Sequence, residues 1–253
     1  MFDHVTIRVG DREASERFYE TVLLPLGVDT TYRTNAVTSW GNFLVTEKSD
    51  EHPVTTGLHV GFVAPTREQV DAFWQAGIDA GYTDDGPPGP RPQYRPDYYG
   101  AFLRDPDGNS AEAVNHGVLA QEGIIDHVWL RVADLAAATA FYRIIAPTAG
   151  LELRHQDPER SSFGVRTAGS FTLVPGAPTA NLHVAFSGHD ADVQRFHADA
   201  LAAGYESNGE PGERARYHPG YYAAFVHDPD GNNIEAVFHG PANRSAASVK
   251  LTF

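Results

Sequence analysis

Two histidines and one glutamate recur together twice along the chain, each in a short segment with the pattern of a β-strand. In the first half they are His4, His59 and Glu112, and in the second half His127, His183 and Glu235. Two neutral imidazoles and a carboxylate suit a borderline divalent ion and leave coordination positions open for substrate or water. We therefore expect up to two metal sites, and Fe(II), Mn(II), Zn(II), Ni(II) and Co(II) all fit these donors.

Strand alternation places these side chains on one face of a sheet. In residues 3–9, Val5, Ile7 and Val9 share one face and His4 lies on the other, because successive side chains of a strand point to opposite sides. The strands that carry the other five residues show the same division. A lone histidine on such a strand is more often a hydrogen-bonded structural residue than a ligand. The recurrence of the whole trio favours metal binding.

The six residues belong to an internal repeat with a period of about 123 residues. YYGAFLRDPDGNSAEAVNHG at 98–117 corresponds to YYAAFVHDPDGNNIEAVFHG at 221–240, with 14 of 20 positions identical. This period is too long for a solenoid and indicates a duplicated domain. Each copy contains two segments that begin with a strand pattern, continue with a helical one and end in strands separated by turn residues.

The pattern predicts an α+β fold built from four β-α-β-β-β units, at about 1–50, 55–118, 123–176 and 180–241. We expect domain 1 to span 1–118, domain 2 to span 123–241, and a C-terminal tail to cover 242–253. Pairing of units within a copy would group His4 with His59 and Glu112. Exchange between copies would group His4 with His183 and Glu235, and His127 with His59 and Glu112. The sequence leaves both groupings open.

The composition is that of a globular protein and argues against several other classes. The chain has 253 residues, of which 42% are hydrophobic and 21% charged, and it contains no cysteine, which excludes disulfides and thiol nucleophiles. A formal net charge of −14 argues against a nucleic-acid partner. No apolar run approaches the roughly 18 residues of a membrane span. The N-terminal segment lacks the features of a signal peptide, so we expect a cytoplasmic protein.

The opening motifs DHVTIRVGDREASERFY and DHVWLRVADLAAATAFY, with the closing motifs DPDGNSAEAV and DPDGNNIEAV, resemble the vicinal-oxygen-chelate superfamily. This is the glyoxalase, bleomycin-resistance and extradiol-dioxygenase group, and the resemblance covers nearly the whole chain, twice. It implies tandem glyoxalase-like domains, each an open cup-shaped mixed sheet of two paired β-α-β-β-β units with helices outside. It also implies a divalent metal held by the six histidines and glutamates named above.

Individual branches of this superfamily match less completely. The fourth ligand of the glyoxalase I branch would fall near Thr46 or Val174, and neither is a typical ligand. The tyrosine of the extradiol dioxygenases corresponds to Phe102 and Phe225, although His218 matches their histidine. The bleomycin-binding branch uses the same fold without a metal, and the intact trios argue against it.

Two Gly- and Pro-rich segments, 86–97 and 209–220, precede the Tyr-Tyr strands. Further candidate residues lie in these segments, directly after them, and near the two glutamates. The candidates for an acid or base are Tyr99, Tyr222 and His218. The candidates for substrate binding are Arg95, Tyr94, Tyr217, His116 and His239. In these roles arginine would pair with an anionic substrate and tyrosine would stack on a ring. The alternative for both segments is a surface connector with solvated arginines.

Together these features predict a small-molecule metalloenzyme of the glyoxalase or dioxygenase type. The metal would polarise an oxygen of an oxygen-rich or aromatic substrate, in dioxygenase, lyase or isomerase chemistry. The alternative is a non-catalytic protein of the bleomycin-resistance type that sequesters a drug or natural product. We expect either a monomer with an internal pseudo-dimer or a homodimer.

Overall fold

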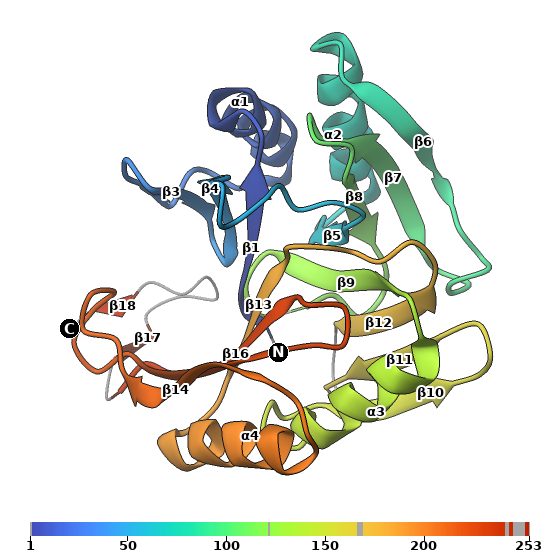
Figure 1. Cartoon of the computed structure of the whole chain (residues 1–253). Helices are drawn as coiled ribbons and strands as arrows, with labels where there is room; N and C mark the ends of the chain where they lie inside the picture. Colours follow the sequence, from blue (N-terminus) through green and yellow to red (C-terminus); the bar gives the residue numbers. More distant parts are fainter. Residues whose placement is uncertain (1, 121, 166–168, 241–242, 245–250, 253) are drawn as a thin grey trace.

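The computed structural model describes residues 2–120, 122–165, 169–240, 243–244 and 251–252. Within them the chain forms the four predicted β-α-β-β-β units in succession (Figure 1). Unit 1 contains β1 (Phe2–Val9), α1 (Arg12–Leu23), η1 (Leu24–Leu26), β2 (Tyr32–Arg33), β3 (Val37–Trp40) and β4 (Phe43–Glu47). Unit 2 contains β5 (His59–Val63), α2 (Arg67–Asp79), β6 (Thr83–Pro90), β7 (Tyr99–Arg104) and β8 (Ser110–Asn115).

The second half of the chain repeats this order. Unit 3 contains β9 (Ile125–Val132), α3 (Leu135–Ile145), β10 (Glu152–Gln156), β11 (Ser161–Gly164) and β12 (Ser170–Pro175). Unit 4 contains β13 (His183–Ser187), α4 (Asp190–Ala202), β14 (Ser207–Glu213), β15 (Tyr222–His227) and β16 (Asn233–Phe238). Most of the predicted tail 242–253 lies outside the described residues. In its described part, β17 (Asn243–Arg244) pairs with β18 (Leu251–Thr252).

Each large sheet combines one unit from each half of the chain. β1 pairs antiparallel with β13, so units 1 and 4 form the 1/4 sheet, in the order β14-β15-β16-β13-β1-β4-β3-β2. β5 pairs antiparallel with β9, so units 2 and 3 form the 2/3 sheet, in the order β10-β11-β12-β9-β5-β8-β7-β6. The units therefore exchange partners between the copies. The boundaries of the predicted domains 1–118 and 123–241 stay a prediction, since each sheet draws on both.

Capping side chains start the helices that cover these sheets. Asp11 accepts a hydrogen bond from the backbone N–H of Ala14 at the start of α1, and Asp134 does the same for Ala136 and Ala137 at the start of α3. Such caps satisfy N–H groups that have no partner within the helix. None of the described helices is long and apolar enough to cross a membrane.

Helix packing and two buried tyrosines join the two sheets. α1 lies beside α2, and α3 beside α4, so that each pair contains one helix from each sheet (Figure 1). The Tyr19 hydroxyl in α1 donates to Asp105 across 2.9 Å, and the Tyr142 hydroxyl in α3 donates to Asp228 across 2.9 Å. Both aspartates open DPDGN turns. The motif therefore links a helix on one sheet to a turn of the other.

Candidate metal centres

His59, Glu112 and His127 converge on one face of the 2/3 sheet, on β5, β8 and β9. His59 Nε2 lies 3.0 Å from Glu112 Oε2 and 3.1 Å from His127 Nε2. His127 Nε2 lies 3.1 Å from the same carboxylate oxygen. Glu112 and His127 are buried and His59 is partly buried. Three donor atoms therefore face a common point, as the ligands of one cation must.

His4, His183 and Glu235 form the corresponding group on the 1/4 sheet. His183 Nε2 lies 2.8 Å from Glu235 Oε2, and His4 Nε2 lies 3.6 Å from the same oxygen. In each group the ligand atoms lie within 4.8 Å of one another. The grouping is the exchanged one, with residues from both copies in each centre. Among the described residues, no fourth His, Asp or Glu joins either group.

The pairing of the first strands sets the space around one histidine of each group. Gly61 pairs with His127, and Ala185 pairs with His4. A Cβ added at Gly61 would lie 2.2 Å from His127 Cε1, so the ring fits there only because the residue is glycine. Ala185 places a methyl group at the matching position beside His4, where the distance to the carboxylate is longer. The two centres therefore differ in local packing.

Hydrogen bonds at Nδ1 orient three of the four imidazoles. His127 Nδ1 donates to Asp126 across 3.0 Å, and His4 Nδ1 donates to Asp3 across 2.9 Å. His59 Nδ1 lies 3.1 Å from Ser110 Oγ. Ser110 itself donates to Asp85, so its oxygen accepts from the imidazole. Protons held at Nδ1 leave the Nε2 lone pairs pointing into the centre, an arrangement typical of metal-binding histidines.

At the 1/4 centre the remaining imidazole has a different neighbour. His183 Nδ1 lies 2.7 Å from the amide nitrogen of Asn233, which stands where the 2/3 centre has Ser110. The rings of His183 and His4 stack at 5.1 Å. This neighbour is a second difference between the two centres.

A tyrosine holds the outer oxygen of each glutamate. The Tyr98 hydroxyl donates to Glu112 Oε1 across 2.7 Å, and the Tyr221 hydroxyl donates to Glu235 Oε1 across 2.6 Å. Oε2 is the oxygen that faces the histidines in both centres. Each carboxylate is thus held for binding through one oxygen.

Buried charge makes these centres favour a cation. Burial alone would lower the pKa of His127, but hydrogen bonds to Asp126 and Glu112 outweigh it and raise this pKa to about 10. Burial also opposes ionisation of Glu112, whose pKa nonetheless falls to about 2 because both histidines of its group bond to it. The carboxylate neighbours of His4 raise its pKa in the same way, against burial.

The structure does not bring Tyr99 and Tyr222 to these centres, and their role as acids or bases stays a prediction. Tyr99 donates to Asp71 of α2 across 2.8 Å, and Tyr222 lies near Gln194 of α4. Both point to the helix-covered face of their sheets. Strand alternation could have predicted this orientation, because Tyr99 shares its face with the buried residues Ala101 and Leu103. The preceding residue, Tyr98, lies on the opposite face and contacts the Glu112 carboxylate.

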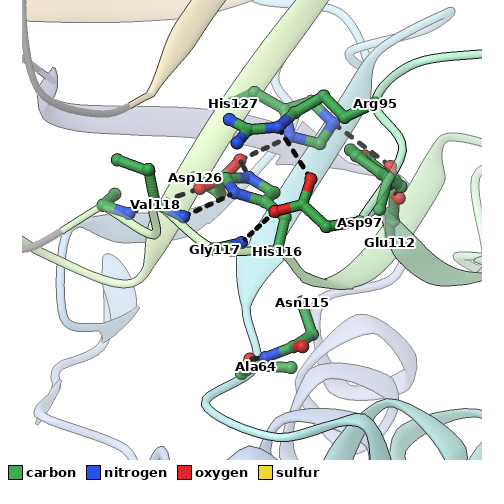
Figure 2. Close-up of polar contacts among 12 residues, drawn as sticks. Ala64, Arg95, Asp97, Glu112, Asn115, His116, Gly117, Val118, Asp126 and His127 are labelled. Atoms are coloured by element: carbon green, nitrogen blue, oxygen red, sulfur yellow. Dashed lines mark hydrogen bonds and ion pairs between the residues drawn. The ribbon is translucent and has the colours of Figure 1, made fainter.

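His116 and His239 contact the aspartates behind the centres. His116 Nε2 lies 3.2 Å from Asp126 Oδ2, which also binds His127 (Figure 2). His239 Nε2 lies 2.9 Å from Asp3 Oδ2. Their predicted contact with substrate stays a prediction. The aspartates themselves were missed, although the Asp-His pair recurs at 3–4 and 126–127.

Arg95 and His218 occupy equivalent places but have different partners. Arg95 Nε donates to Asp97 across 3.1 Å, and Asp97 accepts from the backbone of Gly117 (Figure 2). His218 Nε2 lies 2.9 Å from His239 Nδ1. His218 is thus linked to the aspartate behind the 1/4 centre and does not join the ligand group.

A cavity of about 370 Å³ opens over the 2/3 centre. Its wall includes Trp129, Phe102 and Tyr94, and it reaches the three residues of the metal group. Tyr94 packs edge-on against Trp129 at 5.7 Å. Tyr217, the counterpart of Tyr94, packs against its neighbouring tyrosine at 4.8 Å and is 54% exposed. The predicted stacking role is therefore better placed at Tyr94.

Residues 1–113 and 124–236 each match the family model described as Glyoxalase/Bleomycin resistance protein/Dioxygenase superfamily. The chain belongs to this superfamily. Solved structures that are similar in fold cover most of the chain. Glyoxalase I from Zea mays is 18% identical, with 94% of this chain and 92% of that chain covered and a TM-score of 0.67.

Two further solved structures are similar to this chain, one over nearly its whole length and one over less than half of it. A putative dioxygenase from Bacillus subtilis is 16% identical, with 95% of this chain and 85% of that chain covered and a TM-score of 0.62. A glyoxalase/bleomycin resistance protein from Albidiferax ferrireducens is 38% identical over 45% of this chain and 98% of its own, with a TM-score of 0.42. A comparison with curated proteins found no match. At these identities the full-length similarities establish the fold alone.

Proposed function

We propose that the chain is a metal-dependent enzyme in which each His-His-Glu group binds one divalent cation. One observation carries this proposal most directly. In the 2/3 centre three donor atoms lie within about 3 Å of one another, while the outer atom of every ligand already has a partner. Lone pairs of two imidazoles and a carboxylate repel one another at such distances unless a positive charge lies between them.

The donor set defines the class of cation. Imidazole nitrogen with carboxylate oxygen suits Fe(II), Mn(II), Zn(II) and Ni(II), and three protein ligands leave room for substrate. The raised pKa of His127 indicates that a proton compensates the buried negative charge when a metal does not. When bound, such a cation acts as a Lewis acid that polarises a substrate oxygen. Dioxygenase, lyase and isomerase reactions all use this effect.

The residues around the 2/3 centre would position a planar substrate. Trp129 and Phe102 supply aromatic walls for a ring, as such side chains prefer to pack edge-to-face or offset. Tyr98 would keep the carboxylate in place while the substrate binds. A cavity of about 370 Å³ is within the size range of small-molecule sites. These contacts support an oxygen-rich, aromatic substrate.

The test combines metal analysis with a search for product. Protein purified without chelator is supplied with Mn(II) or Fe(II) and incubated with catechols and 2-hydroxyketones. We expect product formation that is lost in His127→Ala and kept in His52→Ala, which changes an exposed histidine that belongs to neither group. Stoichiometric binding of these compounds without product, unaffected by metal, would instead support the sequestering alternative.

A further inference from the structure

A second hollow, of about 500 Å³, lies on the same face of the 2/3 sheet beyond Trp129. Strand register shows that it continues the metal-site face. His59 pairs with Trp129, Trp129 with Thr172, Thr172 with Ser162, and Ser162 with His155. Paired residues of neighbouring strands point to the same side of a sheet. One row of side chains therefore runs from the metal group across β9, β12, β11 and β10.

This hollow carries positive charge in an acidic protein. Arg154, Arg160 and Arg95 line it, whereas the chain as a whole has a net charge of −14. Its one acidic lining residue among those described is Asp126, which is buried and bound by His116 and His127.

Two arginines of the hollow have exposed acidic partners. Arg95 donates to Asp97 across 3.1 Å, and Arg154, which is 41% exposed, lies 3.4 Å from Glu152. Two hydroxyl groups also line the hollow. Ser162 Oγ and Thr172 Oγ1 lie 3.0 Å apart on the row of side chains described above.

The 1/4 sheet provides an internal comparison. Its matching row runs from His183 to Thr6, Leu44, Ser39 and Tyr32. Leucine and tyrosine there replace the threonine and histidine of the 2/3 sheet, and Thr6 replaces the large ring of Trp129. The row of hydroxyl and imidazole side chains beyond Trp129 is thus a property of the 2/3 sheet and does not follow from the fold alone.

We infer that the hollow lined by Arg154 and Arg160 is a subsite for an anionic oxygen group, a carboxylate or phosphate, at the far end of the substrate. This inference rests on the proposed function, because the other end of the same molecule would lie at the His59 group. Four strand spacings separate β5 from β10, which carries Arg154, and this corresponds to about 19 Å along the sheet. The substrate is therefore extended, with a planar part against Trp129 and an acidic end on the arginine side.

The test is calorimetric titration of the full-length protein with 2-naphthoate and with neutral 2-naphthamide. We expect the double variant Arg154→Gln with Arg160→Gln to bind 2-naphthoate about tenfold more weakly than wild type, as is typical when charge-assisted hydrogen bonds are lost. Its affinity for 2-naphthamide should stay unchanged. The double lysine variant of the same residues keeps the charge and should bind 2-naphthoate more tightly than the glutamine variant.

The matched control is Arg17→Gln with Arg195→Gln, which removes two exposed arginines on α1 and α4. Equal affinity of both glutamine double variants for 2-naphthoate would overturn the subsite, as would equal binding of the acid and the amide by wild type. Each titration is repeated after chelator treatment and with added Mn(II). If the protein takes up no Mn(II) while the arginine effect persists, the metal proposal fails and the anion subsite stands.

Discussion

Replacing Tyr98 by phenylalanine removes one hydrogen bond from Glu112 and keeps the aromatic ring. The hydroxyl lies 2.7 Å from Oε1, both groups are buried, and the carboxylate is held ionised. A hydrogen bond to a charged group contributes about 1.5–3 kcal/mol. Loss of an outer partner of a metal ligand typically weakens metal binding about 10- to 100-fold. We expect Tyr98→Phe to lower the metal affinity of the 2/3 centre by this factor and to leave the 1/4 centre unchanged.

Titration of chelator-treated protein with Mn(II), followed by calorimetry or by the electron paramagnetic resonance of free Mn(II), measures this effect. Wild type should show two binding events, and the variant should weaken only one. Tyr99→Phe is the matched control, because the adjacent hydroxyl donates to Asp71 on the other face of the sheet. If Tyr98→Phe binds both ions as wild type does, the tyrosine does not position the carboxylate and the reasoning is refuted.

Three further predictions concern the same centre. Gly61→Ala should displace the His127 ring, because the added Cβ would lie 2.2 Å from His127 Cε1. Metal analysis should then find one equivalent of metal in place of two, and an unchanged metal content would contradict this packing. Asp126→Asn should weaken the same site about 10- to 100-fold in Mn(II) titration, because a neutral amide replaces the charged acceptor that orients the imidazole. The free energy of unfolding of the chelator-treated protein, measured in urea, should fall as the pH is lowered from 4.5 towards 2. The loss should be at most about 1.4 kcal/mol per pH unit, because Glu112, whose pKa is lowered in the folded protein, stabilises the fold only while it is ionised. Glu112→Gln should show a shallower slope in this range, and an equal slope would show that other groups cause the loss.

Much of the fold follows from periodicity, because alternation and helical spacing are local properties. The apolar face of β1, with Val5, Ile7 and Val9, is buried as alternation predicts, and His4 faces the other side. The duplicated DPDGN turns also marked the strands that carry Glu112 and Glu235.

The grouping of the units was not accessible from the sequence. β1 and β9 begin with the same Asp-His pair and present similar edges, so either can pair with β5 or β13. Choosing between them depends on non-local contacts that periodicity does not encode. Tyr98 was missed for a different reason. It precedes the first residue of β7, so its role depends on where the strand begins.

Metal stoichiometry of two double variants tests the central claim most directly. His4→Ala with Glu235→Gln changes one group, and His4→Ala with Glu112→Gln changes both. We predict about two equivalents of metal in wild type, about one in the first variant and none in the second. One equivalent in the second variant and none in the first would contradict the exchanged grouping. Wild-type protein without metal after reconstitution would contradict the metal centres themselves.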